Sequence, residues 1–255
     1  MEFLTEPEPP RGTPTVVAPG VRRLVANNPG PMTYRGTNTY LLDAPGGVLV
    51  IDPGPDDPSH VAAILAVAPI AGILLTHGHG DHTGALAALR DATGAAVGVV
   101  PEGMVAIATP GHAADHVCFA RADGVVWSGD LVMSWSTSVV SPPDGNMRDY
   151  LASLDRMLAR TGDTLYLPGH GPPLADPRAF VGLLREHRLA RERAVISALA
   201  ATGGGTPATL RPHVYGELAV ALHDAAERSL LAHLEKLVGE RHVEREGATF
   251  RLLAQ

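Results

Sequence analysis

The 255-residue sequence has only one cysteine, Cys118, and only one lysine, Lys236. A single cysteine excludes an intrachain disulfide and cannot build a thiolate metal cluster. No apolar run approaches the roughly 20 residues that a membrane helix needs. The acidic, proline-rich start "MEFLTEPEPPRGTP" lacks both the basic and the apolar region of a secretory signal. We therefore expect a cytoplasmic protein with no membrane partner.

Positive charge is also scarce, because the chain carries a formal net charge of −7 at pH 7. Residues 1–179 hold 10 arginines against 18 acidic residues, whereas residues 180–255 hold 10 basic residues against 9 acidic ones. This balance argues against a protein that holds long nucleic acid by phosphate attraction alone. It leaves a local basic groove open.

Short apolar runs ending in glycine- or proline-bearing loops recur as far as about residue 175, and each is typical of a buried strand. They are "GVLVIDPG" (47–54), "AGILLTHGHGDH" (71–82), "VAIATPGH" (105–112), "GVVWSGD" (124–130) and "TLYLPGH" (164–170). Helical patterns intervene at 58–68, 83–93 and 148–160. Strands that alternate with helices predict an α/β layered fold.

The pattern changes near residue 180, where a long exposed helix is predicted over 178–201. The stretch "TGGGTPATL" is predicted to be a loop, followed by helices over 215–224 and 227–239. The end, "HVEREGATFRLL", predicts a hairpin with its turn near Glu246 and Gly247. Three helices and a hairpin in this order indicate a winged-helix-like module, so we predict domains at 1–179 and 180–255.

Six of the seven histidines before residue 180 lie in or just after loops that follow apolar runs. These are His77, His79, His82, His112, His116 and His170. One such histidine would more often be a cap or a satisfied loop residue. Six in three clusters, with Asp81 and Asp130 in matching positions, indicate a metal site, because imidazole and carboxylate suit zinc, iron or manganese.

Within "HGHGDH", His77 and His79 are two residues apart and can converge on one ion, while Asp81 and His82 turn toward a second. We expect Gly78 and Gly80 to permit backbone angles that a bulkier residue would resist, and to leave room for ions close to the main chain. The remaining ligands must come from other loops at the same sheet edge.

The motif "HGHGDH", followed in order by "TPGH", "SGD" and "LPGHGP", resembles the metallo-β-lactamase superfamily over roughly residues 20–175. The resemblance implies a four-layer αβ/βα sandwich with two zinc ions per chain, iron and manganese being the alternatives. It implies that one ion is held by His77, His79 and His112, that the second is held by Asp81, His82 and His170, and that Asp130 bridges them. Asp52 matches a position that usually buttresses such a site.

A narrower resemblance links "NNPGPMTYRGTNTYLL", "TPGHAADH", "WSTSVVSPPDG" and the C-terminal segment to the β-lactamase-like protein 2 group. Some members of that group are single-strand-directed endoribonucleases, and many are hydrolases of unknown substrate. Only 29 residues separate His82 from His112, where relatives usually have a longer insert that helps to wall the substrate cleft.

Several further residues have two candidate roles each. His116 is a candidate proton donor or a hydrogen-bonding partner that orients a ligand. Asn38, Trp135 and Ser136 are candidate substrate contacts, with turn formation or loop packing as the alternatives. Cys118 is expected to be a buried small side chain, and His60 to lie on a helix surface.

Together these features predict a dinuclear zinc hydrolase that uses a metal-bridging hydroxide, because binding to a metal lowers the pKa of water from about 15.7 to about 7. Asp81 is expected both to bind metal and to orient the nucleophile. Single-stranded RNA narrowly leads as the substrate, a thioester or ester follows, and promiscuous lactam opening is a further alternative. A mononuclear iron sulfur dioxygenase and a non-enzymatic winged-helix binding protein are the other classes. The winged-helix-like module could serve RNA contact or homodimer formation.

Overall fold

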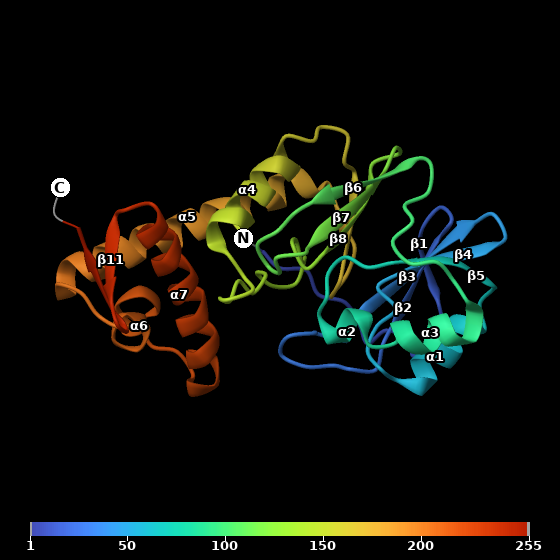
Figure 1. The fold of residues 1–255 in the computed structure, drawn as a ribbon, viewed down its shortest axis with the longest axis horizontal. Helices are drawn as coiled ribbons and strands as arrows, with labels where there is room; N and C mark the ends of the chain where they lie inside the picture. The colour runs from blue at the N-terminus through green and yellow to red at the C-terminus, as the bar shows by residue number, and fades with distance from the viewer. Residues whose placement is uncertain (1, 254–255) are drawn as a thin grey trace. The chain divides into compact units, whose positions relative to one another are not determined.

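The computed structural model describes residues 2–253, with elements labelled as in Figure 1. The chain forms two compact units. The first comprises Met1–Thr109, Asp115–Ser138 and Arg160–Arg178, and the second comprises Pro110–Ala114, Val139–Ala159 and Ala179–Gln255. Both the loop that carries His112 and the segment 139–159 thus belong with the C-terminal residues. The division into domains at 1–179 and 180–255 stays a prediction.

The first unit contains two five-stranded sheets. The first sheet has the order β1-β2-β3-β4-β5, with strands at Thr15–Ala18, Val21–Val25, Asn38–Ala44, Gly47–Ile51 and Ile70–Leu74. The second has the order β10-β9-β8-β7-β6, with β6 to β10 at Met104–Ala108, Val117–Arg121, Val125–Gly129, Leu165–Pro168 and Leu174–Ala175. The predicted α/β sandwich is confirmed.

Side-chain alternation along the strands builds two apolar layers, because successive residues of a strand point to opposite faces. Tyr40 and Ile51 from the first sheet pack with Phe119 and Trp127 from the second, which fills the space between the sheets. The residues in between, such as Leu41, pack on the other face with Ile64 of α1 (Pro58–Leu65) and Leu89 of α3 (Leu86–Thr93). Figure 1 shows α1 and α3 side by side against the first sheet.

Parallel pairing explains why the polar loops converge. β4 pairs in parallel with β5, and β8 pairs in parallel with β9. The carboxyl ends of parallel strands meet at one edge of a sheet, where ligand sites form. Asp52 follows β4, Asp130 follows β8 and His170 follows β9. His77 comes shortly after β5 and leads into the short helix α2 (Gly80–Thr83).

The second unit contains α4 (Met147–Leu158), α5 (Pro177–Thr202), α6 (Pro207–Tyr215), the 3-10 turn η1 (Val220–Leu222), α7 (His223–Gly239) and the hairpin of β11 (Val243–Glu246) with β12 (Thr249–Leu252). Its core packs Val195, Leu210, Leu234 and Phe250 from α5, α6, α7 and the hairpin. The winged-helix prediction is confirmed, including the hairpin turn at Glu246 and Gly247.

One predicted helix is wrong. The pattern over 215–224 predicts a helix, but the helix α6 spans Pro207–Tyr215 and begins within 202–210, the stretch predicted to be a loop. Thr206 caps α6 by accepting a hydrogen bond from the backbone N–H of Thr209, and Pro207 occupies the first turn. Threonine followed by proline is a start signal for a helix, and here it outweighs the neighbouring glycines.

None of the helices in the described residues is both long enough and apolar enough to span a bilayer.

Candidate metal centre

The predicted ligands of the second ion come together where β4 and β5 of the first sheet and β8 and β9 of the second sheet end. Asp81 and His82 lie on α2, Asp130 follows β8, and His170 follows β9. Ligand atoms of Asp81, His82 and His170 lie within 4.8 Å of one another, and so do those of His77, His82 and Asp130. His82, Asp130 and His170 are buried, with exposed fractions of 0%, 6% and 1%.

The spacing of these ligand atoms fits a coordination shell. His170 Nε2 lies 3.3 Å from Asp81 Oδ2 and 3.5 Å from Asp130 Oδ2. His82 Nε2 lies 3.6 Å both from Asp81 Oδ2 and from Asp130 Oδ1. Ordinary N–H···O hydrogen bonds are shorter, at about 2.7–3.2 Å. Ligands about 2.1 Å from a tetrahedral ion lie about 3.4 Å apart, which these four distances match.

His82 provides a second test of the fit to a metal. Its Nε2 is buried and makes no hydrogen bond within the described residues. A buried polar nitrogen without a hydrogen bond is costly in a folded protein, at about 1–3 kcal/mol. A cation between His82, Asp81 and Asp130 would remove that cost, so the residues present fit a metal ion.

Asp52 fixes the orientation of His82. Its carboxylate accepts hydrogen bonds from the Nδ1–H of His82 at 2.9 Å, and from the backbone N–H and hydroxyl of Thr76, both at 2.7 Å. Because Asp52 accepts the proton carried by Nδ1 of His82, the lone pair of His82 is on Nε2, which faces the cluster. Asp52 adopts a φ of 53°, an uncommon backbone conformation that aspartate tolerates. The expected buttressing position is therefore occupied by a residue that sets a tautomer.

His77 is oriented by the same chain of hydrogen bonds. The Thr76 hydroxyl donates to Asp52, so it accepts from His77 Nδ1, which lies 2.9 Å away. This arrangement places the lone pair of His77 on Nε2, 2.9 Å from Nδ1 of His79. The structure thus brings Nε2 of His77 and Nδ1 of His79, two predicted ligands of the first ion, within hydrogen-bond distance of each other.

The electrostatics of the cluster favour cationic species. Burial lowers the pKa of His170, but the carboxylates of Asp130 and Asp81 outweigh this effect and raise the pKa to about 10. Burial also lowers the pKa of His82, but the carboxylates of Asp130 and Asp52 outweigh this effect, so the pKa is raised above its usual value. Burial raises the pKa of Asp81, while His170 and His82 lower it below the usual value. A site that attracts protons so strongly is suited to a divalent cation, which would replace them.

The glycines packed most tightly against side chains of this centre lie outside the motif. Neither Gly78 nor Gly80 adopts a positive φ, so the expectation that they permit unusual backbone angles is wrong. A Cβ on Gly80 would meet nothing within 4 Å. That these glycines leave room for ions stays a prediction. Gly129 instead has a φ of 48°, and a Cβ there would lie 2.6 Å from His116 Nε2. A Cβ on Gly169 would overlap Asp130 Oδ1 and lie 2.6 Å from His82 Cε1. Gly169 thus leaves room for two predicted ligands, and Gly129 leaves room for His116, which holds the loop of Asp130.

His116 is buried, with 1% of its surface exposed. Its Nε2 accepts a hydrogen bond from the backbone N–H of Asp130 at 3.1 Å, so its proton is on Nδ1, which contacts the Thr109 hydroxyl at 2.9 Å. Both ring nitrogens are therefore occupied, Nε2 by the loop of Asp130 and Nδ1 by Thr109. This geometry favours the orienting role over the role of proton donor.

His112 lies between β6 and β7, in the segment 110–114 of the second unit. Its Nδ1–H donates to the carbonyl of Val139 at 2.6 Å, which leaves the lone pair on Nε2. Its role as a ligand of the first ion stays a prediction.

The three candidate substrate contacts differ in accessibility. Asn38 is 1% exposed, and its amide donates to the carbonyls of Pro168 and Gly171, so it holds the loop that carries His170. Trp135 is partly exposed and stacks on Tyr34, with ring centroids 5.0 Å apart. Ser136 is also partly exposed, and its hydroxyl contacts the carbonyl of Thr137 at 3.4 Å. Of the three, Trp135 and Ser136 have surface that a substrate can reach.

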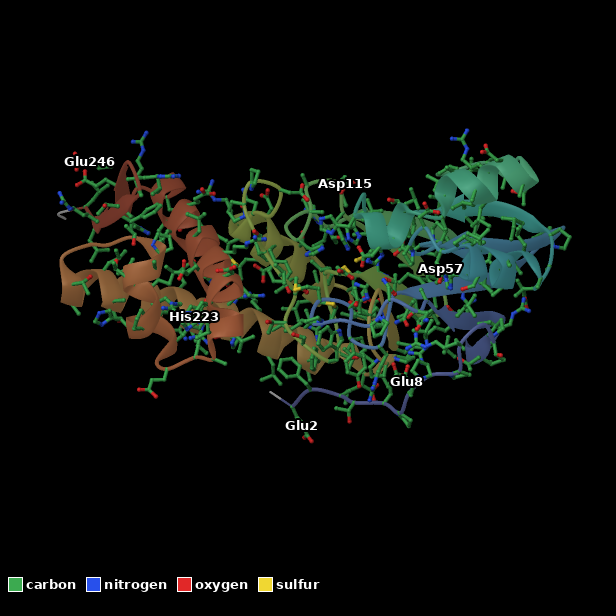
Figure 2. All side chains as sticks on the ribbon, turned by 90° about the horizontal axis from the view of Figure 1, so that it is seen from below. Glu2, Glu8, Asp57, Asp115, His223 and Glu246 are labelled. Atoms are coloured by element: carbon green, nitrogen blue, oxygen red, sulfur yellow. The ribbon has the colours of Figure 1, made fainter. Side chains whose placement is uncertain are left out.

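Two residues predicted to have no role at the metal site, Cys118 and His60, are both buried. Cys118 is fully buried, as predicted, and burial raises the pKa of its thiol to about 12. The prediction for His60 is wrong, because only 4% of its surface is exposed. It lies on α1, which Asp57 caps (labelled in Figure 2), and its Nε2 is 2.8 Å from the Thr39 hydroxyl on β3.

Comparisons with known proteins agree with this geometry. The profile of the Metallo-beta-lactamase superfamily matches residues 32–108, and that of the Beta-lactamase associated winged helix domain matches residues 206–251. The beta-lactamase-like protein 2 homolog of Caenorhabditis elegans is 30% identical over 258 residues, which cover 88% of this chain and 86% of the relative. An atrochrysone carboxyl ACP thioesterase of Aspergillus chevalieri is 30% identical over 262 residues, covering 89% and 83% respectively. The crystal structure of a beta-lactamase domain protein from Burkholderia ambifaria has a TM-score of 0.82 and 25% identity, covering 96% of this chain and 95% of that one.

Proposed function

Because the chain belongs to the metallo-β-lactamase superfamily and is a hydrolase, we propose that it hydrolyses an acyl thioester or ester at a dinuclear zinc centre. The observation that carries the proposal is the set of four distances, from 3.3 to 3.6 Å, that joins His82 and His170 to Asp81 and Asp130. In this proposal the first ion is bound by His77, His79 and His112, the second by Asp81, His82 and His170, and both by Asp130. Iron or manganese would suit the same ligands.

When bound, two such ions supply a water of lowered pKa as the nucleophile and polarise the oxygen of the group under attack. The chain's own residues supply the orientation. The Asp81 side chain is 30% exposed, whereas those of Asp130 and His82 are 8% and 0% exposed. Substrate and water therefore reach the cluster from the side of Asp81, whose carboxylate is placed to accept a hydrogen bond from the nucleophile and hold it for attack.

The charge of the second unit supports a thioester or ester over RNA. Five of its basic side chains are paired with acidic residues of the same unit: Arg185 with Asp155, Arg211 with Glu227, Lys236 with Glu192, Arg245 with Glu235 and Arg251 with Glu246. Cations that are already paired attract phosphates weakly. The name of the Aspergillus chevalieri relative points to the same class of substrate, since an ACP thioesterase cleaves a thioester.

Cleavage of single-stranded RNA is the second candidate. It is supported by the winged-helix domain and by the likeness to the beta-lactamase-like protein 2 homolog over 88% of the chain. The same water could attack a phosphodiester, with the winged helix as the surface that holds the RNA strand. We also propose that the protein works in the cytoplasm. Association into a homodimer stays a prediction that light scattering would test.

The experiment is a turnover panel on purified protein loaded with zinc. It compares an acyl-glutathione thioester, an aryl ester, single-stranded RNA and a chromogenic lactam, and metal analysis accompanies each preparation. We expect two zinc ions per chain and the highest kcat/KM on the thioester. Asp130→Ala should lower the metal content and abolish turnover, while Asp43→Ala, an exposed control on β3, should change neither.

Three results would contradict the proposal. Full activity of Asp130→Ala would exclude this centre as the site of reaction. RNA cleavage far above thioester cleavage would replace the substrate class. One iron per chain together with oxygen consumption would indicate a sulfur dioxygenase.

A further inference from the structure

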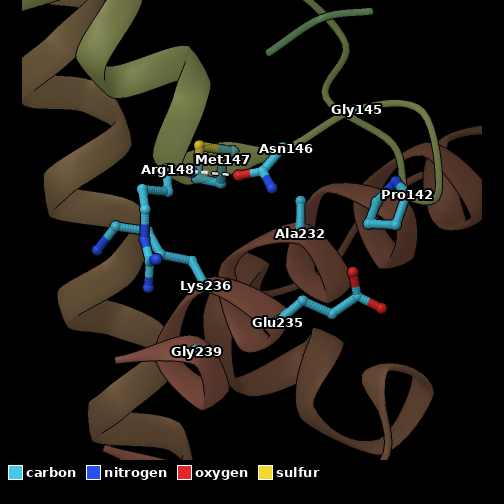
Figure 3. Close-up of a pocket in the computed structure, with 9 residues that line it drawn as sticks. All are labelled: Pro142, Gly145, Asn146, Met147, Arg148, Ala232, Glu235, Lys236 and Gly239. Atoms are coloured by element: carbon cyan, nitrogen blue, oxygen red, sulfur yellow. Dashed lines mark hydrogen bonds between the residues drawn. The ribbon is translucent and has the colours of Figure 1, made fainter. Parts of the chain in front are cut away.

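A pocket of about 240 Å³ lies within the second unit, outside the metal cluster. Its walls come from the segment before α4 with the first turn of that helix, and from the C-terminal half of α7 (Figure 3). The lining residues are Pro142, Gly145, Asn146, Met147, Arg148, Ala232, Glu235, Lys236 and Gly239. Ligand pockets for drug-sized molecules measure about 300–1,000 Å³. This pocket therefore suits a smaller molecule.

Two side chains at the pocket have hydrogen-bond donors that no described residue accepts. The guanidinium of Arg148 makes no hydrogen bond in the described part of the chain, and its nearest acidic partner, Glu240, is 4.0 Å away. Asn146 caps α4 by accepting two backbone hydrogen bonds through Oδ1, at 2.9 and 3.2 Å. That leaves its amide NH₂ as a donor, and Figure 3 shows this group directed into the pocket.

The other charged groups around the pocket are already paired. Lys236 donates to Glu192 at 2.8 Å and to Glu240 at 2.9 Å. Glu235 accepts from Arg245 at 3.5 Å. The groups left to interact with a ligand are therefore donors, one of them cationic. A carboxylate or a phosphate complements such a set, because a guanidinium binds either of these oxyanions through two parallel hydrogen bonds.

Gly239 helps to place the guanidinium. A Cβ on Gly239 would lie 3.0 Å from Arg148 Nη2, so the guanidinium packs directly against the end of α7. On the opposite side, Ala232 presents only a methyl group to the pocket (Figure 3). Small residues at 232 and 239 thus leave open the space that the donors face.

The wall of this pocket is continuous with the support of His112. The segment 139–146 contributes Pro142, Gly145 and Asn146 to the lining. The same segment accepts the Nδ1–H of His112 at the carbonyl of Val139, at 2.6 Å. Two more hydrogen bonds join it to the His112 loop, from Asn146 N to Gly111 O at 2.8 Å and from Ala114 N to Asp144 Oδ1 at 3.1 Å. A molecule in the pocket would therefore contact the segment that orients His112.

We propose that this pocket is an accessory site for a small organic oxyanion, held by Arg148 and Asn146, and that its occupancy is coupled to metal binding through His112. A ligand that restrains segment 139–146 reduces the conformational entropy lost when His112 takes up a metal ion, so the two ligands favour each other. The coupling rests on the role of His112 as a metal ligand, which is part of the proposed function. Binding of the oxyanion to the pocket does not depend on that role.

Binding is tested on metal-free protein by calorimetry with two probes, succinate for a carboxylate source and glycerol 3-phosphate for a phosphate source. We expect saturable binding of at least one probe, about tenfold or more weaker in Arg148→Gln, because a charge-assisted hydrogen bond is lost. Ala232→Leu keeps every charge and fills the pocket, so it should weaken binding as well. Arg228→Gln, an exposed arginine of α7 outside the lining, should bind as the wild type does.

Absence of saturable binding to both probes, or equal loss in Arg148→Gln and Arg228→Gln, would overturn the site. The coupling is then measured by zinc titration against a chromophoric chelator, with and without a saturating probe. We expect zinc affinity to rise about fivefold or more, and probe affinity to rise by the same factor when zinc is bound, because coupling between two sites is reciprocal. An unchanged zinc affinity would overturn the link to His112. Failure of the hydrolase proposal would leave the calorimetry on metal-free protein unaffected.

Discussion

His82 donates its Nδ1–H to the carboxylate of Asp52 across 2.9 Å, and the two side chains are only 0% and 3% exposed. The contact joins the loop after β4 to helix α2. The carboxylate at the end of β4 therefore fixes the orientation of the imidazole ring on α2. Since Asp52 accepts the only proton of a neutral imidazole, His82 Nε2 is left as the nitrogen that can bind a metal. Asp52 therefore acts on the metal through His82 without touching it.

Asp52→Asn tests this relationship. Asparagine is nearly the same size and tolerates the φ of 53°, so the backbone should be kept. Its amide can accept at only one oxygen, whereas Asp52 accepts from His82 and twice from Thr76. We expect the zinc affinity to fall about 10–100-fold, as is typical when a group that orients a metal ligand is changed. Competition with a chromophoric chelator measures it. Asp43→Asn is the matched control, and equal affinity in both variants would contradict the role of Asp52.

Gly169→Ala tests the close approach within the cluster. The added methyl would overlap Asp130 Oδ1 and lie 2.6 Å from His82 Cε1, so both side chains would have to move. Displacement of a reacting group by about 1 Å can cost about 100-fold in rate. We expect a loss of that size in kcat, together with a lower zinc content. Gly162→Ala adds the same methyl where nothing lies within 4 Å, and it should behave as the wild type does. An active, zinc-replete Gly169→Ala would show that the ligands tolerate the shift.

The parts of the site that the sequence predicts are those encoded within short segments. His77, His79, Asp81 and His82 are close in the chain, and the parallel pairing of β8 with β9 places Asp130 beside the loop of His170. The glycines show where such reasoning stops. The motif drew attention to Gly78 and Gly80, yet the constrained positions are Gly129 and Gly169, whose neighbours belong to other loops. Only the fold reveals which backbone lies against which side chain.

His116→Ala separates two roles for a buried histidine. If His116 orients the loop of Asp130 by accepting its backbone N–H, removing the ring leaves that donor unsatisfied. We expect the free energy of unfolding to fall by about 1–3 kcal/mol and kcat to fall, with both limbs of the pH–rate profile retained. A proton donor would behave differently, because its removal would abolish the limb at high pH. Loss of that limb without any loss of stability would therefore assign the catalytic role to His116. Urea unfolding and a pH–rate profile distinguish the two.

His60 illustrates a second limit of prediction. Its place on an amphipathic helix suggests a solvent-facing residue, but the Thr39 hydroxyl on β3, 2.8 Å from its Nε2, makes the position a buried one. Helix periodicity identifies a polar residue and cannot identify a polar partner on a distant strand. The helix at α6 is a different case, because its start signal, Thr206 followed by Pro207, is local and stands in the sequence. The glycines just before it favour a loop, but the helix forms.

The burial of His60 makes the stability of the protein depend on pH. Burial lowers the pKa of His60 from 6.5 to about 4 in the folded chain. The unfolded chain therefore binds a proton more readily between these values, so the contribution of His60 is complete above pH 6.5 and is lost as the pH falls toward 4. At about 1.4 kcal/mol for each pH unit, the loss between pH 7 and pH 5 is about 2 kcal/mol. His60→Gln cannot titrate, so urea unfolding of metal-free protein should show it losing about 2 kcal/mol less than the wild type over that interval. Equal losses in the two proteins would show that His60 is protonated in the folded state as readily as in the unfolded one.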